Sequence, residues 1–215
     1  MCGSQFDLEH ALSCGKGGFI IQRHNELRDL SANLLAEVCK DVAIEPVLEK
    51  LSGETFKCKS TITSDDARLD VSARGFWTRG QRAFFDVKVF NPYAQTYSGK
   101  TISQAYSVNE QTKKRNYNQR VLEVENGTFT PLVFCANGGM GPECRHFFKR
   151  LCGLIADKRG DRISSITSWV RTRTSFALLR SAIMGIRGTR HPFYKAKIQE
   201  VDVDCDNNTA SIEQM

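Results

Sequence analysis

The chain has 215 residues, a formal net charge of +6 and a sequence pI near 8.9, with 40% hydrophobic and 25% charged residues. This composition is that of a globular protein long enough to bury a core without covalent crosslinks, as one α/β domain with a small appendage or as two small domains. No run approaches the roughly 18 apolar residues of a membrane span, and the polar N-terminus leads us to expect no signal peptide.

The N-terminal segment carries soft metal ligands close together. Cys2, His10 and Cys14 fall within thirteen positions, which is typical of a zinc site, although three ligands do not close a tetrahedron. The fourth ligand is His24 or Cys58, or it precedes the chain. The alternative is that these residues are unrelated surface or core positions. In either case eight scattered cysteines without a secretory signal favour reduced thiols in an intracellular compartment.

Hydrophobic periodicity predicts the remaining elements in chain order. We expect a helix over 22–40, a strand over 42–48, a polar loop over 52–66, a hairpin over 68–90, a helix over 101–121, a strand over 130–136, a helix that begins at Pro142 and a helix over 163–186. The order helix, strand, hairpin, helix, strand, helix predicts a mixed α/β sheet with helices on both faces, as in a restriction-endonuclease-like core.

Two acids and a lysine dominate the predicted hairpin. Asp70 ends the first half, and Asp86 and Lys88 are the only polar residues of the apolar second strand. Residues two apart in a strand share a face, so Asp86 and Lys88 project to one side. Two carboxylates and an ammonium that converge suit a Mg²⁺ site for phosphodiester cleavage. The alternative is a half-buried Asp86–Lys88 ion pair with no catalytic role.

The predicted helix over 101–121 follows this strand by one loop. Glu110, Lys113 or Lys114, and Tyr117 lie on one of its faces. Such a helix can present a lysine to a phosphate near the acids, and the alternative is a solvated charged face.

Basic residues gather in three stretches of the chain, a distribution that favours a polyanionic partner. Charge alone does not separate this from an ordinary solvated basic surface. The three groups are Arg68, Arg74, Arg79 and Arg82; Lys113, Lys114, Arg115 and Arg120; and Arg171, Arg173, Arg180, Arg187 and Arg190.

Taken together, these motifs resemble the C-terminal region of site-specific non-LTR retrotransposon proteins, in which a CCHC zinc knuckle directly precedes a PD-(D/E)XK endonuclease domain. The resemblance covers about residues 2–122. It rests on Cys2…His10…Cys14, Gly17-Gly18, Arg23-His24-Asn25, Glu45-Pro46, Asp70…Asp86-Val87-Lys88 and Glu110…Lys114…Tyr117. Leu69 stands where the family often has proline, and the first knuckle cysteine is missing.

The resemblance implies four parts: a zinc-knuckle-like segment (1–18), an endonuclease-like core (19–136), a C-terminal helical extension (137–190) and a disordered tail (191–215). It implies a nuclear, Mg²⁺- or Mn²⁺-dependent enzyme that nicks DNA so that a reverse transcriptase can copy element RNA there. Asp70 and Asp86 would hold the metal, and Lys88 would serve the attacking water.

The resemblance also assigns roles around these three residues. Lys114 and Tyr117 would contact phosphate. Apart from the resemblance, the basic clusters make Arg74, Arg79, Lys113 and Lys114 the candidate DNA-binding residues. His24 or Glu26 could face the metal, or His24 could instead be a capping or core residue. Two other readings stay open at this point: an inactivated nuclease fold that still binds nucleic acid, and a zinc-dependent interaction protein whose acids are structural.

Overall fold

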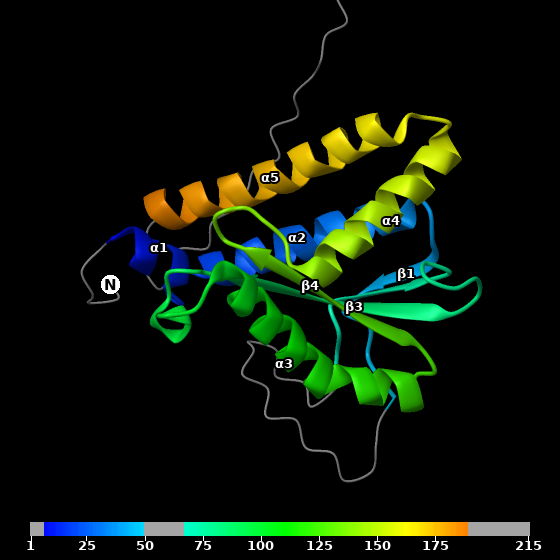
Figure 1. Ribbon diagram of the computed structural model, residues 1–215, viewed down its shortest axis with the longest axis horizontal. Coiled ribbons are helices and arrows are strands. Elements are labelled where there is room, and N and C mark those ends of the chain that lie inside the picture. The colour runs from blue at the N-terminus through cyan, green and yellow to red at the C-terminus, as the bar shows by residue number, and fades with distance from the viewer. Residues whose placement is uncertain (1–6, 50–66, 189–215) are drawn as a thin grey trace, which may run out of the picture.

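A computed structural model describes residues 7–49 and 67–188 of the chain (Figure 1). The elements are α1 (Leu8–Ser13), α2 (Phe19–Ala36), β1 (Lys40–Ile44), β2 (Val71–Arg74), β3 (Arg82–Phe90), a short 3-10 turn η1 (Gln95–Tyr97), α3 (Ile102–Glu123), β4 (Thr128–Cys135), α4 (Pro142–Arg159) and α5 (Ile163–Arg187). The fold is mixed α/β, as the sequence predicts. Cys58, the alternative fourth zinc ligand, and the predicted tail over 191–215 lie outside the described residues.

The four strands form one mixed sheet in the order β1-β2-β3-β4. The β1, β2 and β3 strands are antiparallel neighbours, whereas β4 runs parallel to β3 along its length, from Ala83 opposite Thr128 to Phe90 opposite Cys135. A parallel pair needs a long crossover connection, which α3 supplies. The strand β3 is therefore central, and this explains why it reads as a nearly continuous apolar run.

Helices cover both faces of this sheet, with α2 and α4 on one face and α3 on the other (Figure 1). Phe85 and Val87 of β3 belong to the larger core with α2 and α4, while Phe84 and Phe90 pack in the two smaller clusters on the α3 side. Successive strand residues alternate between faces. Asp86, two positions from Phe84, therefore faces α3.

Local signals account for the limits of α3. Thr101 Oγ1 accepts a hydrogen bond from the backbone N–H of Gln104 (3.2 Å), and the Thr101 N–H donates to Gln104 Oε1 (2.8 Å). This reciprocal capping box fixes the helix start. The helix runs to Glu123, two residues beyond the predicted end.

The first strand and first helix differ from the sequence-based prediction. The strand covers Lys40–Ile44 rather than 42–48, because Glu45 adopts a left-handed conformation (φ 51°) and Pro46 follows it. Leu48 then turns into the cluster on the α3 side. The helix α2 begins at Phe19, after Gly18 in a left-handed conformation (φ 76°), and ends at Ala36 rather than at residue 40.

The two C-terminal helices belong to the same core as the sheet. Phe147 and Leu151 of α4 and Val170 of α5 share one cluster with Leu34 of α2 and Phe85 of β3. Residues 137–188 thus form the outer layers of the domain. None of the helices in the described residues is both long and apolar enough to cross a membrane.

Candidate functional site: the acid pair beside β3

Asp70 directly precedes β2, and its charge lies close enough to Asp86 to raise the pKa of that carboxyl group. The last ladder pair of β2 and β3 joins Val71 to Phe85, so Asp70 and Asp86 are the next residues beyond this pair on the two chain segments. Beyond this pair the backbone of β2 no longer bonds to β3, and the Asp70 side chain bonds to the β3 backbone instead. Asp70 Oδ2 accepts a hydrogen bond of 2.6 Å from the backbone N–H of Val87. The two predicted acids, Asp70 and Asp86, therefore lie near the end of the β2–β3 ladder.

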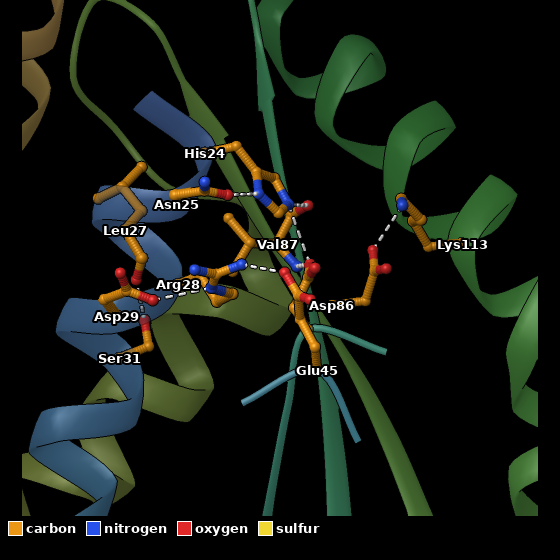
Figure 2. A network of polar contacts seen from close by, with 11 residues as sticks. His24, Asn25, Leu27, Arg28, Asp29, Ser31, Glu45, Asp86, Val87 and Lys113 are labelled. Carbon is orange, nitrogen blue, oxygen red and sulfur yellow. Dashed lines mark hydrogen bonds and ion pairs between the residues drawn. The ribbon is translucent and has the colours of Figure 1, made fainter. Parts of the chain in front are cut away.

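His24 of α2 also contacts the Asp70 carboxylate (Figure 2). Its Nε2 lies 3.1 Å from Asp70 Oδ2 and 3.1 Å from the carbonyl oxygen of Val87. A carbonyl only accepts, so Nε2 carries a hydrogen in this arrangement. Burial lowers the pKa of His24, but the hydrogen bond and charge of Asp70 outweigh it, and the net shift is upward.

Asp86 is the buried carboxylate of the site, with 5% of the residue exposed. Its Oδ2 lies 2.6 Å from Nζ of Lys113, which reaches in from α3 (Figure 2). Burial raises the pKa of Asp86; Lys113 opposes this, and Asp70 adds to it, so the net shift is upward. The pKa of Lys113 also rises, since the pairing with Asp86 outweighs its own burial.

Lys88 shares the face of Asp86, two residues further along β3. Its side chain is exposed overall. Nevertheless partial burial of the ammonium group, followed by the positive charge of Lys113, lowers the pKa of Lys88 against the pull of Asp86. Two lysines therefore compete for one buried carboxylate, and Lys113 forms the contact.

The donor set suits a hard divalent cation. Two carboxylates from adjacent strands repel each other, and a cation between them relieves that repulsion. Within residues 7–49 and 67–188, no three His, Cys, Asp or Glu side chains gather closely enough to form a complete metal cage. Mg²⁺ commonly takes only one or two carboxylates and keeps several waters.

A second charged network supports Asp70 from the α2 side (Figure 2). Arg28 donates to Asp29 Oδ1 (2.8 Å) and to Glu45 Oε1. The Glu45 backbone N–H donates to the carbonyl oxygen of Asp70 (2.9 Å). This network ties α2 to the end of β1 and fixes the backbone next to the first acid. The sequence pattern alone did not predict this role of Glu45, which was named only as part of the Glu45-Pro46 motif of the resemblance.

On α3, the neighbouring lysines point to different partners. Lys113 contacts Asp86, whereas Lys114 Nζ lies 2.5 Å from Oε1 of Glu143 at the start of α4. Tyr117 packs against Phe129 with ring centroids 5.7 Å apart, and Lys113 Nζ lies 5.7 Å from the Tyr117 ring. The residue that reaches the acids from this helix is therefore Lys113, one position before the lysine that the resemblance assigns to phosphate.

The sequence carried no signal that separates Lys113 from Lys114. The buried residues of α3 include Tyr106, Glu110 and Val121. Lys113 is seven residues after Tyr106 and eight before Val121, and Lys114 is eight after Tyr106 and seven before Val121, so helical spacing places both lysines near that face.

The proposed DNA-binding arginines lie toward the other end of the hairpin. Arg74 pairs with Arg82 in the ladder, and its Nε lies 2.7 Å from Asp41 Oδ2. Arg79 is exposed in the turn that follows. Asp86 is four positions after Arg82 in β3, a distance of about 13 Å along the strand. These arginines can contact a long polyanion that also passes the acids.

The residues of the predicted zinc segment divide between two places. His10 is on α1, and Cys14 follows it as a buried free thiol. His24 uses Nε2 at the acid pair, and its Nδ1 lies 3.4 Å from Asn25 Oδ1. Both ring nitrogens of the proposed fourth ligand thus have other contacts in this structure. Cys2 lies outside the described residues, and zinc at this segment stays a prediction.

Compared with known proteins, the chain matches no family model and no curated protein.

Proposed function

We propose that the protein is a Mg²⁺- or Mn²⁺-dependent DNA endonuclease that nicks target DNA for retrotransposon integration in the nucleus, with a reverse transcriptase and element RNA as partners. The observation that carries the cleavage activity is the buried carboxylate of Asp86 near Asp70, with two lysines beside it. The targeting, the partners and the compartment rest on the resemblance of the motifs alone.

The side chains of the site divide the chemistry among them. A divalent cation bound by Asp70 and Asp86 would polarise the scissile phosphate and a bound water. Val87 N–H and His24 hold the Asp70 carboxylate in a fixed orientation. Lys88, whose pKa is lowered, is suited to hold a water or to release a proton near the acids. Lys113 neutralises Asp86 in this structure and would be available to a phosphate oxygen if a cation took its place.

A second function, nucleic-acid binding without cleavage, is favoured by a specific observation. Both carboxylates have protein partners, Asp70 with Val87 and His24 and Asp86 with Lys113. A buried acid that is paired can serve stability alone. A metal must displace Lys113 from Asp86, and an inactivated nuclease fold would retain the ion pair instead.

A plasmid-nicking assay separates the two functions. Purified protein is incubated with supercoiled plasmid and Mg²⁺ or Mn²⁺, and DNA binding is measured in parallel by fluorescence anisotropy. We expect the wild type to form open-circular DNA and Asp86→Asn to lose at least about 100-fold in rate, or about 2.7 kcal/mol of transition-state stabilisation, because the amide removes a charged ligand.

Asp41→Asn is the matched control, since Asp41 is an exposed acid that pairs with Arg74 at the other end of the hairpin. It should nick at the wild-type rate. Wild-type protein that binds DNA and never nicks it, with either metal, would favour the inactive binding module. Equal nicking by wild type and Asp86→Asn would remove Asp86 from the mechanism.

A further inference from the structure

The helix α5 has apolar side chains on two opposite faces. Its inner face, which includes Val170, Ala177 and Leu178, is buried against the rest of the domain. On its outer face Phe176, Leu179, Ile183 and Ile186 are 66%, 55%, 42% and 39% exposed, respectively. Figure 1 shows α5 as the outermost layer, with α2 and α4 beneath it. We refer to these four residues as the outer stripe.

The spacing within the outer stripe is that of a helix–helix seam. The four residues follow one another at intervals of three, four and three positions. Apolar residues at this 3.5-residue period line up along one side of a helix, where they fit the matching seam of a second helix. Isolated exposed apolar side chains are common on protein surfaces. Four in one continuous seam instead indicate an interaction surface.

The charges on α5 indicate which kind of helix fits. The helix contains no acidic residue, and three of its arginines recur every seven residues along one edge of the outer stripe: Arg173, Arg180 and Arg187. Arg180 pairs with Glu26, and Arg173 lies over the ring of Trp169 at 5.1 Å. The opposite edge has the small uncharged residues Ser175 and Ala182. One edge therefore carries three arginines, and the other carries small residues with Arg171 nearer the start of the helix.

A surface groove of about 810 Å³ adjoins the outer stripe. Phe176 and Leu179 belong to both, and the groove continues toward the start of α5 past Thr172 and Arg171, with Lys149 of α4 on its rim. Toward the start of α5 the groove is lined mainly by serine and threonine side chains, with Ile163 at its far end. Its two cations add to the positive charge of the arginine edge.

We propose that the outer stripe docks an acidic amphipathic helix of a partner protein. The apolar seam supplies the contact area, and the arginine edge selects a helix with Glu or Asp beside its own seam. A second copy of this chain fits less well, because it would bring the same excess of arginines to the interface, and its Glu26 is already paired with Arg180. A nucleic acid would satisfy the arginines but would leave four apolar side chains without matching contacts. This inference is independent of the proposed nuclease activity.

Two synthetic peptides test the proposal on the full chain. Each has about 21 residues with Leu at both seam positions of every heptad; one has Glu at the flanking positions and the other has Lys. Binding is measured by fluorescence anisotropy, at peptide concentrations where neither peptide self-associates. We expect the Glu peptide to bind at least about tenfold more tightly than the Lys peptide, with the difference shrinking as salt is added.

Variants locate the binding on α5. Leu179→Ser and, separately, Ile183→Ser should each weaken the Glu peptide by about tenfold or more, because buried apolar contacts dominate such interfaces. Leu122→Ser is the matched control, since Leu122 is 60% exposed on α3 and should leave binding unchanged. The double change Arg173→Glu with Arg187→Glu should reverse the preference toward the Lys peptide. Thermal melts establish that each variant folds.

Several results would overturn the proposal. They are equal binding of both peptides, binding that Leu179→Ser and Ile183→Ser leave intact, or no binding of either peptide. A wild-type dimer in sedimentation experiments that Leu179→Ser converts to monomer would assign the stripe to a second copy. A single-stranded oligonucleotide that displaces the Glu peptide and that Phe176→Ser no longer binds would assign it to nucleic acid.

Discussion

At the scale of single residues, the site depends on how two acids are held differently. Asp70 is fixed by the Val87 N–H and by His24, whereas Asp86 is buried against one lysine. Burial raises the pKa of Asp86 against the opposing charge of Lys113. If the proposed cation binds, Asp86 would gain from it the compensation for its burial, and Asp70 is already held in one orientation beside it.

Binding and cleavage should separate when Asp86 and Lys88 are changed in turn. Asp86→Ala removes a negative charge that faces the DNA, so affinity for DNA should stay equal or rise slightly while nicking is lost. Lys88→Ala should also abolish nicking but weaken binding modestly, because a positive charge is gone. Anisotropy with a labelled duplex measures both shifts. Shifts of the same sign would contradict the placement of both residues beside the phosphate.

The His24–Asp70 contact should make stability depend on pH. The pKa of His24 is raised in the folded state, so its stabilising contribution is complete below the unfolded value of about 6.5 and is lost as pH rises through the folded value. The difference in melting temperature between wild type and His24→Gln should therefore narrow from about pH 6 to pH 8. When Asp70→Asn is already present, the effect of His24→Gln on the melting temperature should not change with pH. A melting-temperature difference between wild type and His24→Gln that widens as pH rises would contradict the His24–Asp70 contact.

At the scale of elements, Glu110 joins α3 to the start of α4. It is 7% exposed, and its Oε1 accepts a hydrogen bond of 3.0 Å from the backbone N–H of Glu143. This carboxylate satisfies one of the free N–H groups at the α4 N-terminus, where negative charge is also favourable. Gly141, just before α4, leaves room for it, since a Cβ there would overlap Oε1 of Glu110.

Two glycine-to-alanine changes around α4 should have opposite effects. Gly141→Ala should destabilise the fold by about 1–3 kcal/mol, because the new Cβ displaces Glu110 and frees a buried N–H. Gly153→Ala, inside α4, meets nothing within 4 Å and should stabilise by about 0.5–1 kcal/mol through helix propensity. Urea denaturation measures both. A neutral Gly141→Ala would show that Glu110 does not need this gap.

Sequence patterns were sufficient for the elements and insufficient for the contacts between them. The apolar run of β3, broken only by Asp86 and Lys88, predicted a buried strand with a charged pair on one face, and the structure has such a strand. His24 is 46 residues from Asp70, and no local pattern reports that approach. The predicted strand over 42–48 failed at Glu45, where a positive φ bends the chain. Spacing alone left Lys113 and Lys114 open because both fall near one helix face.

At the scale of the whole molecule, positive charge is spread over several elements beyond the Asp70–Asp86 pair. Arg79 is exposed at the hairpin turn, and the arginines of α5 lie on the outer layer (Figure 1). Arg74 and Lys114 are partly neutralised by Asp41 and Glu143. Their contribution to a polyanion is therefore expected to be smaller than that of Arg79.

DNA affinity should fall steeply with salt if this charge is used. Between about 50 and 200 mM salt we expect a loss of at least tenfold, since phosphate contacts release counterions. Arg79→Ala should weaken binding to all sequences alike and reduce the salt slope by about one, with a smaller effect for Arg74→Ala. If the DNA affinity measured by anisotropy does not change over this salt range, the claim that lysine and arginine contacts to phosphate drive binding is wrong.

Calorimetric titration with Mn²⁺ tests most directly whether Asp70 and Asp86 share a divalent cation. We predict that the wild type and the control variant Asp41→Asn each bind one Mn²⁺ ion per chain. Asp70→Asn and Asp86→Asn should each abolish this binding, although both variants remain folded. Mn²⁺ binding that survives both changes, or a folded wild type that binds no Mn²⁺ even with uncleavable DNA present, would contradict the metal site at β3.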